Sequence, residues 1–370
     1  MENILCIGHS FIVDNNRKFW NDFDKYNVDL VAPSSWNSGL QKNMTFNTSK
    51  TIDQNINTTS LKTYFKGNNS LYFYEIINFY KTLKNKKYKF IYIWQETWSI
   101  SLLQLIIFKI FTKNSNTKIY LNICENLNKH KSILVKLLEQ FNCKFVNKLL
   151  CCDSNIAKII KEKNITTKCY YYPFPINHNQ FVFRKRDFDS PLNLGFIGRL
   201  TKEKGISNLI ETLNTLNANL KLVIAGNGLL KDFVMEQPYV NYLGLIPHNQ
   251  AQLFYDQIDV LILPSLTTPR WKEQFGRVLV EAALSGCLVI GSSSGAIPEV
   301  MTKLGYKQFI FKENDSEDLM RVLKQIIILQ KKSPEKLINL IKQCRENAIE
   351  NFSHKAVIKL TMDLENLNPL

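Results

Sequence analysis

Two carboxylates bracket the nine residues EQFGRVLVE, from Glu273 to Glu281, which follow the apolar run DVLILPS. A helical pattern begins inside this segment, so the amides of Phe275, Gly276 and Arg277 should form an anion site at the helix start. We expect Glu273, in the loop, to bind a neutral polyhydroxyl group, and Glu281, inside the helix, to bind a ribose. The alternative is that Glu281 pairs with Arg277 and that Glu273 only favours the helix dipole.

A second candidate anion site lies in GRLTKEKG, which follows the strand-like run LNLGFIG. Gly198 allows a sharp turn, and Arg199 and Lys204 precede a helical pattern. Two cations beside a helix start are suited to a pyrophosphate. Solvated surface cations are the alternative interpretation. Taken with Glu273 and Glu281, the segment predicts a site for a nucleotide-diphosphate sugar.

Two further strand ends could complete that site. AGNGLL places Gly226 after a strand, but it lacks the third glycine of a dinucleotide fingerprint, so no nicotinamide cofactor is expected. In NYLGLIP, Leu245 and Ile246 stand where a strand gives way to a loop. They could support a flat nucleobase, although ordinary packing is an equally good interpretation.

In order and spacing, the runs GRLTKEKG, AGNG, YLGLIP and EQFGRVLVEAALSGCLVIGSSSGAIPEV resemble the C-terminal half of family 4 retaining glycosyltransferases of the GT-B fold. The resemblance covers about 110 residues and includes an E-x7-E motif followed by a G-x-x-P-E element, here Gly295 to Glu299. It implies that Arg199 and Lys204 hold the donor diphosphate, that Glu273 contacts the donor sugar and that Glu281 binds the ribose. Glu273, Arg199 and Lys204 are then the expected catalytic residues.

The resemblance also implies partners. The donor is expected to be UDP- or GDP-linked, and the acceptor a glycan or a lipid-linked glycan, in assembly of a surface polysaccharide such as lipopolysaccharide O-antigen or capsule. Neither a cofactor nor a metal is expected. Two D-x-D strings, Asp22 to Asp24 and Asp187 to Asp189, lie in a helical pattern and in an interdomain stretch. We interpret both strings as surface charge.

Other functions stay open. A nucleotide-sugar hydrolase or epimerase would need the same donor site. A net charge of +15 and a pI near 9.3 also fit a nucleic-acid-binding protein. No nucleic-acid motif accompanies the charge, so no nucleic-acid partner is expected.

Strand-like runs alternate with helical periodicity through most of the 370 residues, which predicts parallel sheets covered on both faces. The polar stretch FRKRDFDSP interrupts the alternation. We therefore predict an α/β protein of two doubly wound, Rossmann-like domains facing a cleft. The first spans residues 1–185, the second spans 186–353, and a helix in 354–370 could return to the first. Ligands should bind at the carboxyl ends of the strands.

Polar residues at strand ends of the first half are candidates for the acceptor side. His9, Asn16 and Arg17 follow the first strand, and Glu96, Glu125 and Asn126 follow two later strands. Arg17 could equally be an ordinary helix-start residue. The other histidines (His130, His178, His248 and His354) we take as structural or solvated.

The N-terminus shows no signal peptide, and the longest apolar segment is too short to span a bilayer. The eight cysteines show no metal-binding spacing. We expect a cytoplasmic protein, and a peripheral location at the inner face of the membrane stays open. NKHKSILVKLLEQFNCKFVNK surrounds an apolar stripe with lysines, namely Lys129, Lys131, Lys136, Lys144 and Lys148 around Ile133, Leu134, Leu137, Leu138 and Phe141. Such a helix could lie on anionic lipid, or pack on the sheet with its basic face solvated.

Overall fold

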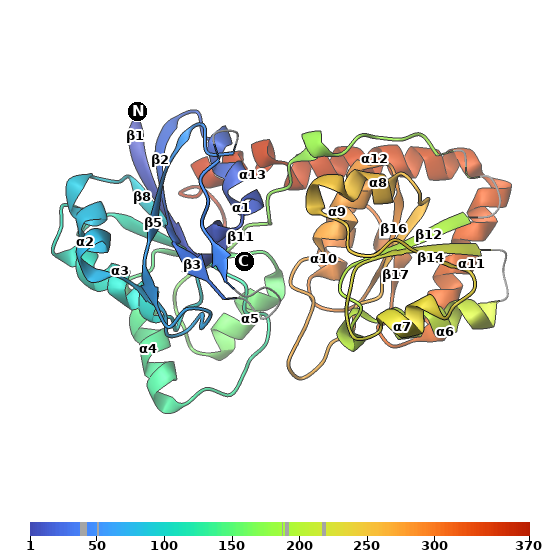
Figure 1. The fold of residues 1–370 in the computed structure, drawn as a ribbon, viewed down its shortest axis with the longest axis horizontal. Coiled ribbons are helices and arrows are strands. Elements are labelled where there is room, and N and C mark those ends of the chain that lie inside the picture. Colours follow the sequence, from blue (N-terminus) through green and yellow to red (C-terminus); the bar gives the residue numbers. More distant parts are fainter. Residues whose placement is uncertain (38–42, 50–51, 187, 189–191, 217–219) are drawn as a thin grey trace. The chain divides into compact units, whose positions relative to one another are not determined.

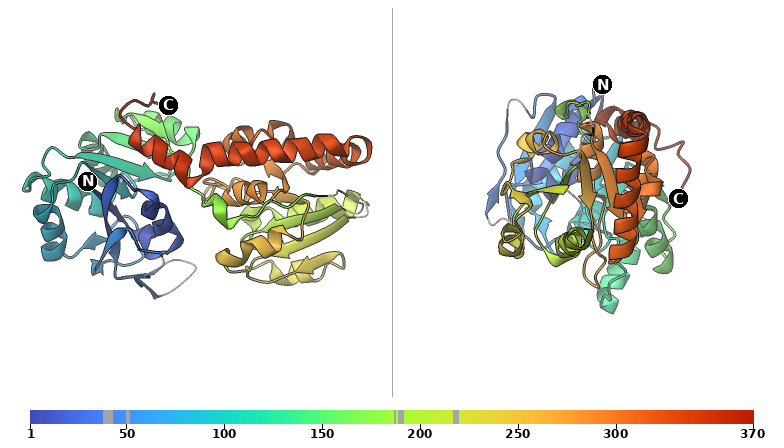
Figure 2. Two further views of the ribbon diagram at one scale, coloured as in Figure 1. Left: turned by 90° about the horizontal axis from the view of Figure 1, so that it is seen from above. Right: turned by 90° about the vertical axis from the view of Figure 1, so that its right-hand side faces the viewer.

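The protein is described by a computed structural model that covers residues 1–37, 43–49, 52–186, 188, 192–216 and 220–370. The chain forms two compact units. Unit 1 comprises Met1–Tyr172 with Ile358–Leu370, and unit 2 comprises Pro173–Val357. Each unit is built on its own parallel sheet with helices packed against it (Figures 1 and 2).

The sheet of unit 1 has the strand order β11-β10-β9-β8-β1-β2-β5, and every neighbouring pair is parallel. Its central strands are buried and apolar, as a sheet covered on both faces requires. Two short antiparallel pairs, β3–β4 and β6–β7, lie outside this sheet. The strands are β1 Glu2–Gly8, β2 Tyr26–Pro33, β3 Ser35–Trp36, β4 Met44–Thr45, β5 Ile56–Leu61, β6 Thr63–Tyr64, β7 Phe73–Tyr74, β8 Phe90–Trp94, β9 Lys118–Ile123, β10 Lys148–Cys151 and β11 Cys169–Tyr171.

The helices of unit 1 connect these strands, and α3 packs against both α2 and α4. Their bounds are η1 His9–Ile12, α1 Asn15–Lys18, η2 Phe19–Asp22, α2 Ile76–Asn85, α3 Ile100–Ile110, α4 Ile133–Lys144 and α5 Ser154–Glu162. Among the helices of the described ranges, none combines the length and apolarity that a bilayer crossing requires.

The sheet of unit 2 is also parallel, in the order β14-β13-β12-β15-β16-β17. The order of the connections reverses between β12 and β15, the point where doubly wound folds bind their ligands. The strands are β12 Leu192–Ile197, β13 Leu220–Ala225, β14 Val240–Tyr242, β15 Val260–Leu263, β16 Leu288–Ser292 and β17 Ile310–Phe311.

In unit 2, helix α12 contacts α9, α10 and α11, and α11 also contacts α6 (Figure 1). The bounds are η3 His178–Gln180, η4 Lys202–Lys204, α6 Ile206–Leu216, α7 Lys231–Met235, η5 His248–Gln250, α8 Ala251–Tyr255, α9 Arg277–Leu284, α10 Ile297–Leu304, η6 Lys307–Phe309, α11 Ser316–Lys332 and α12 Pro334–Phe352. The last helix, α13 His354–Met362, runs from unit 2 into the terminal segment that belongs to unit 1.

The predicted α/β class with two Rossmann-like domains is confirmed. The division differs from the predicted boundary at 185/186, because the segment from Pro173 onward packs within unit 2. The ring of Phe174 lies 5.2 Å from that of Phe275, and the buried Arg186 donates to the carbonyls of Tyr255 and Ser285. The segment 358–370 groups with unit 1.

Candidate active site

The loops after β12 and β15 pack directly on each other at the switch point of unit 2. A Cβ at Gly205, which has a φ of +69°, would lie 1.8 Å from the carbonyl oxygen of Pro264. The amide of Leu266 donates to the carbonyl of Glu203 at 2.8 Å. Only glycine allows this approach, and it brings the predicted cations of the first loop beside the predicted acid of the second.

Glu273 and Lys204 form the centre of this site. The Lys204 Nζ lies 2.7 Å from Oε2 of Glu273, and the buried hydroxyl of Ser265 donates to the same oxygen at 2.8 Å. The ammonium also lies 4.8 Å from the ring centroid of Trp271. An ammonium has three N–H donors, so the contact with Glu273 leaves donors for an anionic ligand. Ser265 and Trp271 were not singled out from the sequence, although Ser265 stands at a strand end in DVLILPS.

The G-x-x-P-E element supports Glu273 through the backbone. The amide of Ala296 donates to the Glu273 carbonyl at 3.1 Å. Gly295 has a φ of +56°, and a Cβ there would lie 2.0 Å from that carbonyl oxygen. The backbone of this element therefore holds the loop of Glu273 in place.

Glu281 lies inside α9, where it is almost completely buried. The hydroxyl of Tyr255 donates to its Oε2 at 2.9 Å. Its Oε1 lies 3.9 Å from both Nδ1 of His248 and Nε of Arg277. The pairing of Glu281 with Arg277, which was the alternative interpretation, is thus present, although the two groups are 3.9 Å apart. The sequence did not indicate Tyr255 or His248 as partners, because they come from the segment before β15.

The remaining donor-side residues lie on the same edge of the sheet. Arg199 is partly exposed and pairs with Glu203 at 3.3 Å, so the cation reaches solvent. Gly198 and Gly226 pack together, since a Cβ at Gly226 would lie 1.8 Å from the carbonyl oxygen of Gly198. Leu245, three residues beyond the end of β14, is 76% exposed, and Ile246 is half-buried. An exposed leucine at a strand end is consistent with the predicted nucleobase support.

At the start of α9, the predicted anion-site residues play different parts. Gly276 is the N-cap, with a φ of 80°, and Arg277 is the first helical residue. Phe275 is buried, and its ring lies 5.6 Å from that of Phe352. The side chain of Phe275 thus anchors the loop in the core, while the helix start provides backbone amides.

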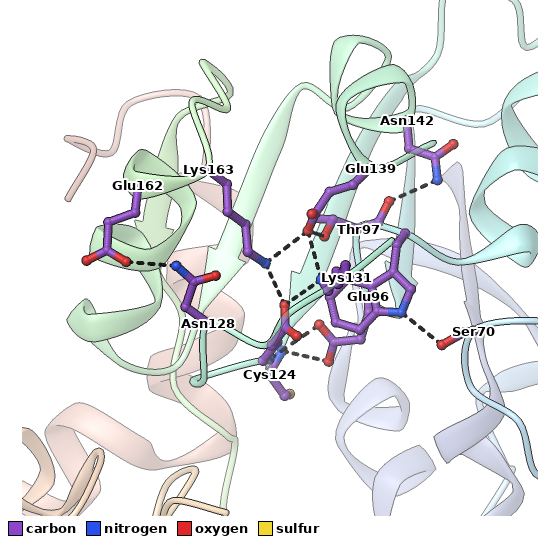
Figure 3. Close-up of polar contacts among 12 residues, drawn as sticks. Ser70, Glu96, Thr97, Cys124, Asn128, Lys131, Glu139, Asn142, Glu162 and Lys163 are labelled. Atoms are coloured by element: carbon purple, nitrogen blue, oxygen red, sulfur yellow. Dashed lines mark hydrogen bonds and ion pairs between the residues drawn. The ribbon is translucent and has the colours of Figure 1, made fainter. Parts of the chain in front are cut away.

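In unit 1, two of the predicted acceptor-side acids come together at the ends of β8 and β9. The carboxylate of Glu96 accepts from the amides of Cys124 and Glu125 at 3.3 Å each (Figure 3). Desolvation and the neighbouring charge of Glu125 raise the pKa of Glu96 to about 7. A carboxyl that titrates near neutrality could act as a base or an acid.

Glu125 instead belongs to an ion-pair network. Its Oε2 lies 2.9 Å from the Nζ of Lys131 and 2.6 Å from that of Lys163. Both lysines also contact Glu139, and Lys131 lies 3.0 Å from the ring centroid of Trp98. We define Glu125, Lys131, Glu139 and Lys163 as the lysine network (Figure 3). These groups satisfy one another, which indicates a structural role.

The three predicted residues that follow β1, namely Arg17, Asn16 and His9, contact other residues of unit 1. Arg17 is fully buried, pairs with Asp53 at 2.8 Å and Asp14 at 3.0 Å, and donates to the carbonyls of Phe11 and Asn47. The prediction that Arg17 lines the acceptor side is therefore wrong, since its guanidinium is enclosed by this unit.

Asn16 donates to the carbonyl of Ser10 at 2.8 Å. His9 lies against Trp36, with ring centroids 4.9 Å apart, and desolvation lowers the pKa of His9 to about 4. His9 is therefore neutral near pH 7.

Asn126, the last of the predicted acceptor-side residues, is also buried.

Among the described residues, no three His, Cys, Asp or Glu side chains group closely enough to hold a metal ion. Asp22 lies in η2 and Asp24 follows it. Asp187 and Asp189 of the second D-x-D string lie outside the described residues.

Solved structures of other proteins share this fold. HepE of Anabaena, crystallised with UDP, matches with a TM-score of 0.71 at 15% identity, covering 99% of this chain and 100% of that one. The lipopolysaccharide outer core galactosyltransferase WaaB matches with a TM-score of 0.67 at 16% identity, covering 99% and 100%. At such low identity these structures establish the GT-B fold.

Sequence relatives match shorter regions. An uncharacterized glycosyltransferase of Methanocaldococcus jannaschii is 35% identical over 115 residues, 29% of this chain and 28% of the relative. The putative colanic acid biosynthesis glycosyltransferase WcaL of Salmonella typhimurium is 26% identical over 179 residues, 45% of this chain and 43% of the relative. The chain thus spans less than half the length of both relatives.

One family matches nearly the whole of unit 2. Residues 179–348 match the family described as Glycosyl transferases group 1. The matched range contains both loops of the switch point and all of the donor-side residues described above. The chain is therefore similar to the group 1 glycosyl transferases over residues 179–348, which make up most of unit 2.

Proposed function

We propose that this chain is a retaining glycosyltransferase that moves a sugar from a nucleotide-diphosphate donor, UDP- or GDP-linked, to a glycan or lipid-linked acceptor. The observation that carries the proposal is the 2.7 Å contact between Lys204 and Glu273 at the switch point of unit 2. A cation and a carboxylate side by side suit the two halves of such a donor. The family of this domain and the UDP bound to HepE support the donor class.

Lys204 and Arg199 are the proposed ligands of the diphosphate, and Glu273 is the proposed ligand of the sugar hydroxyls. Glu281 is assigned to the ribose, with Tyr255 orienting its carboxylate through the 2.9 Å hydrogen bond. Leu245 is assigned to the face of the nucleobase. Each assignment uses a group that the carboxyl edge of this sheet presents.

The reaction is driven mainly by electrostatics. The bond between the anomeric carbon and the diphosphate oxygen breaks, and an acceptor hydroxyl oxygen bonds to that carbon on the same face. The hydroxyl proton passes to the leaving diphosphate. Negative charge grows on that diphosphate, so Lys204, Arg199 and the amides at the start of α9 lower the barrier. The chain itself supplies these cations, and we expect no requirement for a metal.

The acceptor assignment rests on the relatives. WcaL is named for colanic acid biosynthesis and WaaB for the lipopolysaccharide outer core. By analogy we assign this chain to surface polysaccharide assembly, whether lipopolysaccharide or capsule. Glu96, which follows β8 at the carboxyl edge of the sheet, is the residue of unit 1 that we assign to the acceptor hydroxyl, which it would orient by a hydrogen bond.

Calorimetric titration of the purified protein with UDP, GDP, ADP, dTDP and CMP, and with their common sugar conjugates, tests the donor site. We expect one nucleotide to bind selectively and binding to weaken at least about tenfold in Arg199→Ala and Glu281→Ala variants. Lys202→Ala, an exposed lysine of the same loop, is the matched control and should bind as the wild type does.

Product analysis separates the related functions. Transfer of the sugar to an acceptor glycan, with the anomeric configuration of the donor kept, is the expected result. Free sugar or an epimerised nucleotide sugar, formed equally well without acceptor, would replace the transferase proposal with a hydrolase or epimerase. Binding of polynucleotides but of no nucleotide sugar would overturn the enzyme proposal altogether.

A further inference from the structure

Several large apolar side chains of helix α4 in unit 1 are exposed to solvent. Ile133 and Leu134 are 74% and 75% exposed, Leu137 is 57% exposed and Phe141 is 44% exposed. Phe145, which caps the helix, is 41% exposed. The spacing of three or four residues places these side chains on one side of the helix, and we call them the apolar stripe. Ordinary surface helices turn such a stripe toward the core.

The opposite side of α4 is polar and buried. Glu139 pairs with Lys131 at 3.2 Å and with Lys163 at 3.0 Å, and it accepts from the Thr97 hydroxyl. Asn142 is completely buried and donates to the carbonyls of Thr97 and Ser99, at 2.9 and 3.2 Å (Figure 3). These contacts fix the rotation of the helix about its own axis. The apolar stripe is therefore held outward by the network beneath it.

The exposed charges of α4 and of the turn just before it are positive. Lys136 and Lys144 on α4 and Lys129 just before it are exposed, whereas the one acid within α4, Glu139, is buried. Two lysines of the expected basic face have other roles. Lys131 belongs to the lysine network, and Lys148 is buried with its ammonium donating to the carbonyl of Leu364. The five residues of the apolar stripe do not follow the sheet-packing interpretation of this helix, because they face solvent, whereas Leu138 of the predicted stripe is half-buried.

We propose that the apolar stripe and its exposed lysines are the surface by which this protein docks on a bilayer containing anionic lipid. Apolar side chains enter the boundary between headgroups and acyl chains, while the lysines contact the phosphates. Charge complementarity favours this occupant over a second copy of the chain, since a second copy would bring the same cations to the contact. The proposal does not depend on the proposed transferase activity, because docking is measured by binding alone.

Co-sedimentation of the full chain with vesicles tests the docking surface. The vesicles consist of phosphatidylcholine alone, or of phosphatidylcholine mixed equally with phosphatidylglycerol. We expect binding only to the anionic vesicles. A Leu137→Gln, Phe141→Gln double variant should bind more than about tenfold more weakly, since two large apolar side chains no longer enter the membrane. A Leu253→Gln, Ile328→Gln variant changes two exposed apolar residues of unit 2 and should bind as the wild type does.

A second pair of variants tests the charges. Lys136→Gln and Lys144→Gln should each weaken binding to anionic vesicles about fivefold, whereas Lys331→Gln on α11 should have no effect. Equal melting temperatures of all variants show that the exposed substitutions leave the fold intact. The proposal is overturned if the wild type ignores anionic vesicles or if the Leu137, Phe141 variant binds them normally. Self-association that this variant abolishes, without vesicle binding by the wild type, would assign the stripe to a second copy instead.

Discussion

The sheets of the two units have the same strand order at their centres but carry different chemistry at their carboxyl edges. Read from β5 to β11, the sheet of unit 1 runs third, second, first, then fourth onward, as the sheet of unit 2 does from β14 to β17. In unit 2 the switch point holds Lys204 and Glu273, with cations that reach solvent. In unit 1 the acids after β8 and β9 are surrounded by their own chain, and two lysines satisfy Glu125.

The contrast separates fold from function. A doubly wound sheet provides a ligand-binding edge, but only groups with unused donors or acceptors at that edge can bind a substrate. The two units therefore differ in how completely the charged side chains at the carboxyl edge of the sheet are paired with partners from their own unit. Four substitutions test this contrast, from the largest expected effect to the smallest.

Lys204→Ala should lower kcat/KM for sugar transfer by about 10²–10³-fold, because the leaving diphosphate loses its main cation. Steady-state kinetics with the donor identified by calorimetry measures the loss. Lys202→Ala, in the same short helix η4, is the matched control. A loss confined to stability, with normal kcat/KM, would mean that Lys204 only neutralises Glu273 and that unit 2 is as self-compensated as unit 1.

Arg17→Leu should destabilise the protein by about 3 kcal/mol, because Asp53, itself almost fully buried, would lose its cation. Urea unfolding of this variant and of the neighbouring Lys18→Ala control measures the change. Nucleotide binding by unit 2 should persist in the folded variant. An unchanged stability combined with a lost acceptor affinity would restore Arg17 to the acceptor side.

Glu96→Gln should stabilise the protein at pH 8 by about 3 kcal/mol and leave it nearly unchanged at pH 4.5. The pKa of Glu96 is about 7 in the folded protein and near 4.5 when unfolded. Between about pH 4.5 and pH 7, Glu96 is protonated in the folded protein and ionised in the unfolded chain. The free energy of unfolding of the wild type therefore falls as the pH rises through this range. Urea unfolding of both proteins at several pH values isolates this residue. A stability difference that does not change with pH would contradict the shifted pKa.

Glu281→Gln should raise the KM for the donor about tenfold with little change in kcat, because a uniformly bound ribose contact is weakened. Tyr255→Phe tests the positioning of the same carboxylate and should give a smaller change in KM. Initial rates at varied donor concentration measure both. A collapse of kcat in Glu281→Gln would place this residue at the reacting atoms rather than at the ribose.

The sequence alone was most informative about unit 2. The runs LNLGFIG, NYLGLIP and DVLILPS correspond to β12, β14 and β15, because the strands of a parallel sheet are rich in apolar residues. Arg199, Lys204, Glu273 and Glu281 were identified from their places beside strand ends and helix starts. In unit 1, the edge strand β5, INTTSL, is mostly polar and gives no such run, because an edge strand needs only part of its surface buried.

Tertiary structure decided what each charged group contacts. Lys204 and Glu273 are far apart in the sequence, and only the packing of Gly205 on Pro264 brings their loops together. In the sequence, Arg17 and Glu96 are both polar residues that follow a strand. In the structure, Arg17 is paired with two carboxylates, whereas burial raises the pKa of Glu96 to about 7. The direction of the apolar stripe on α4 likewise depends on Glu139 and Asn142, whose partners come from distant segments. Periodicity establishes that a helix has two different sides, but long-range contacts determine which side is buried.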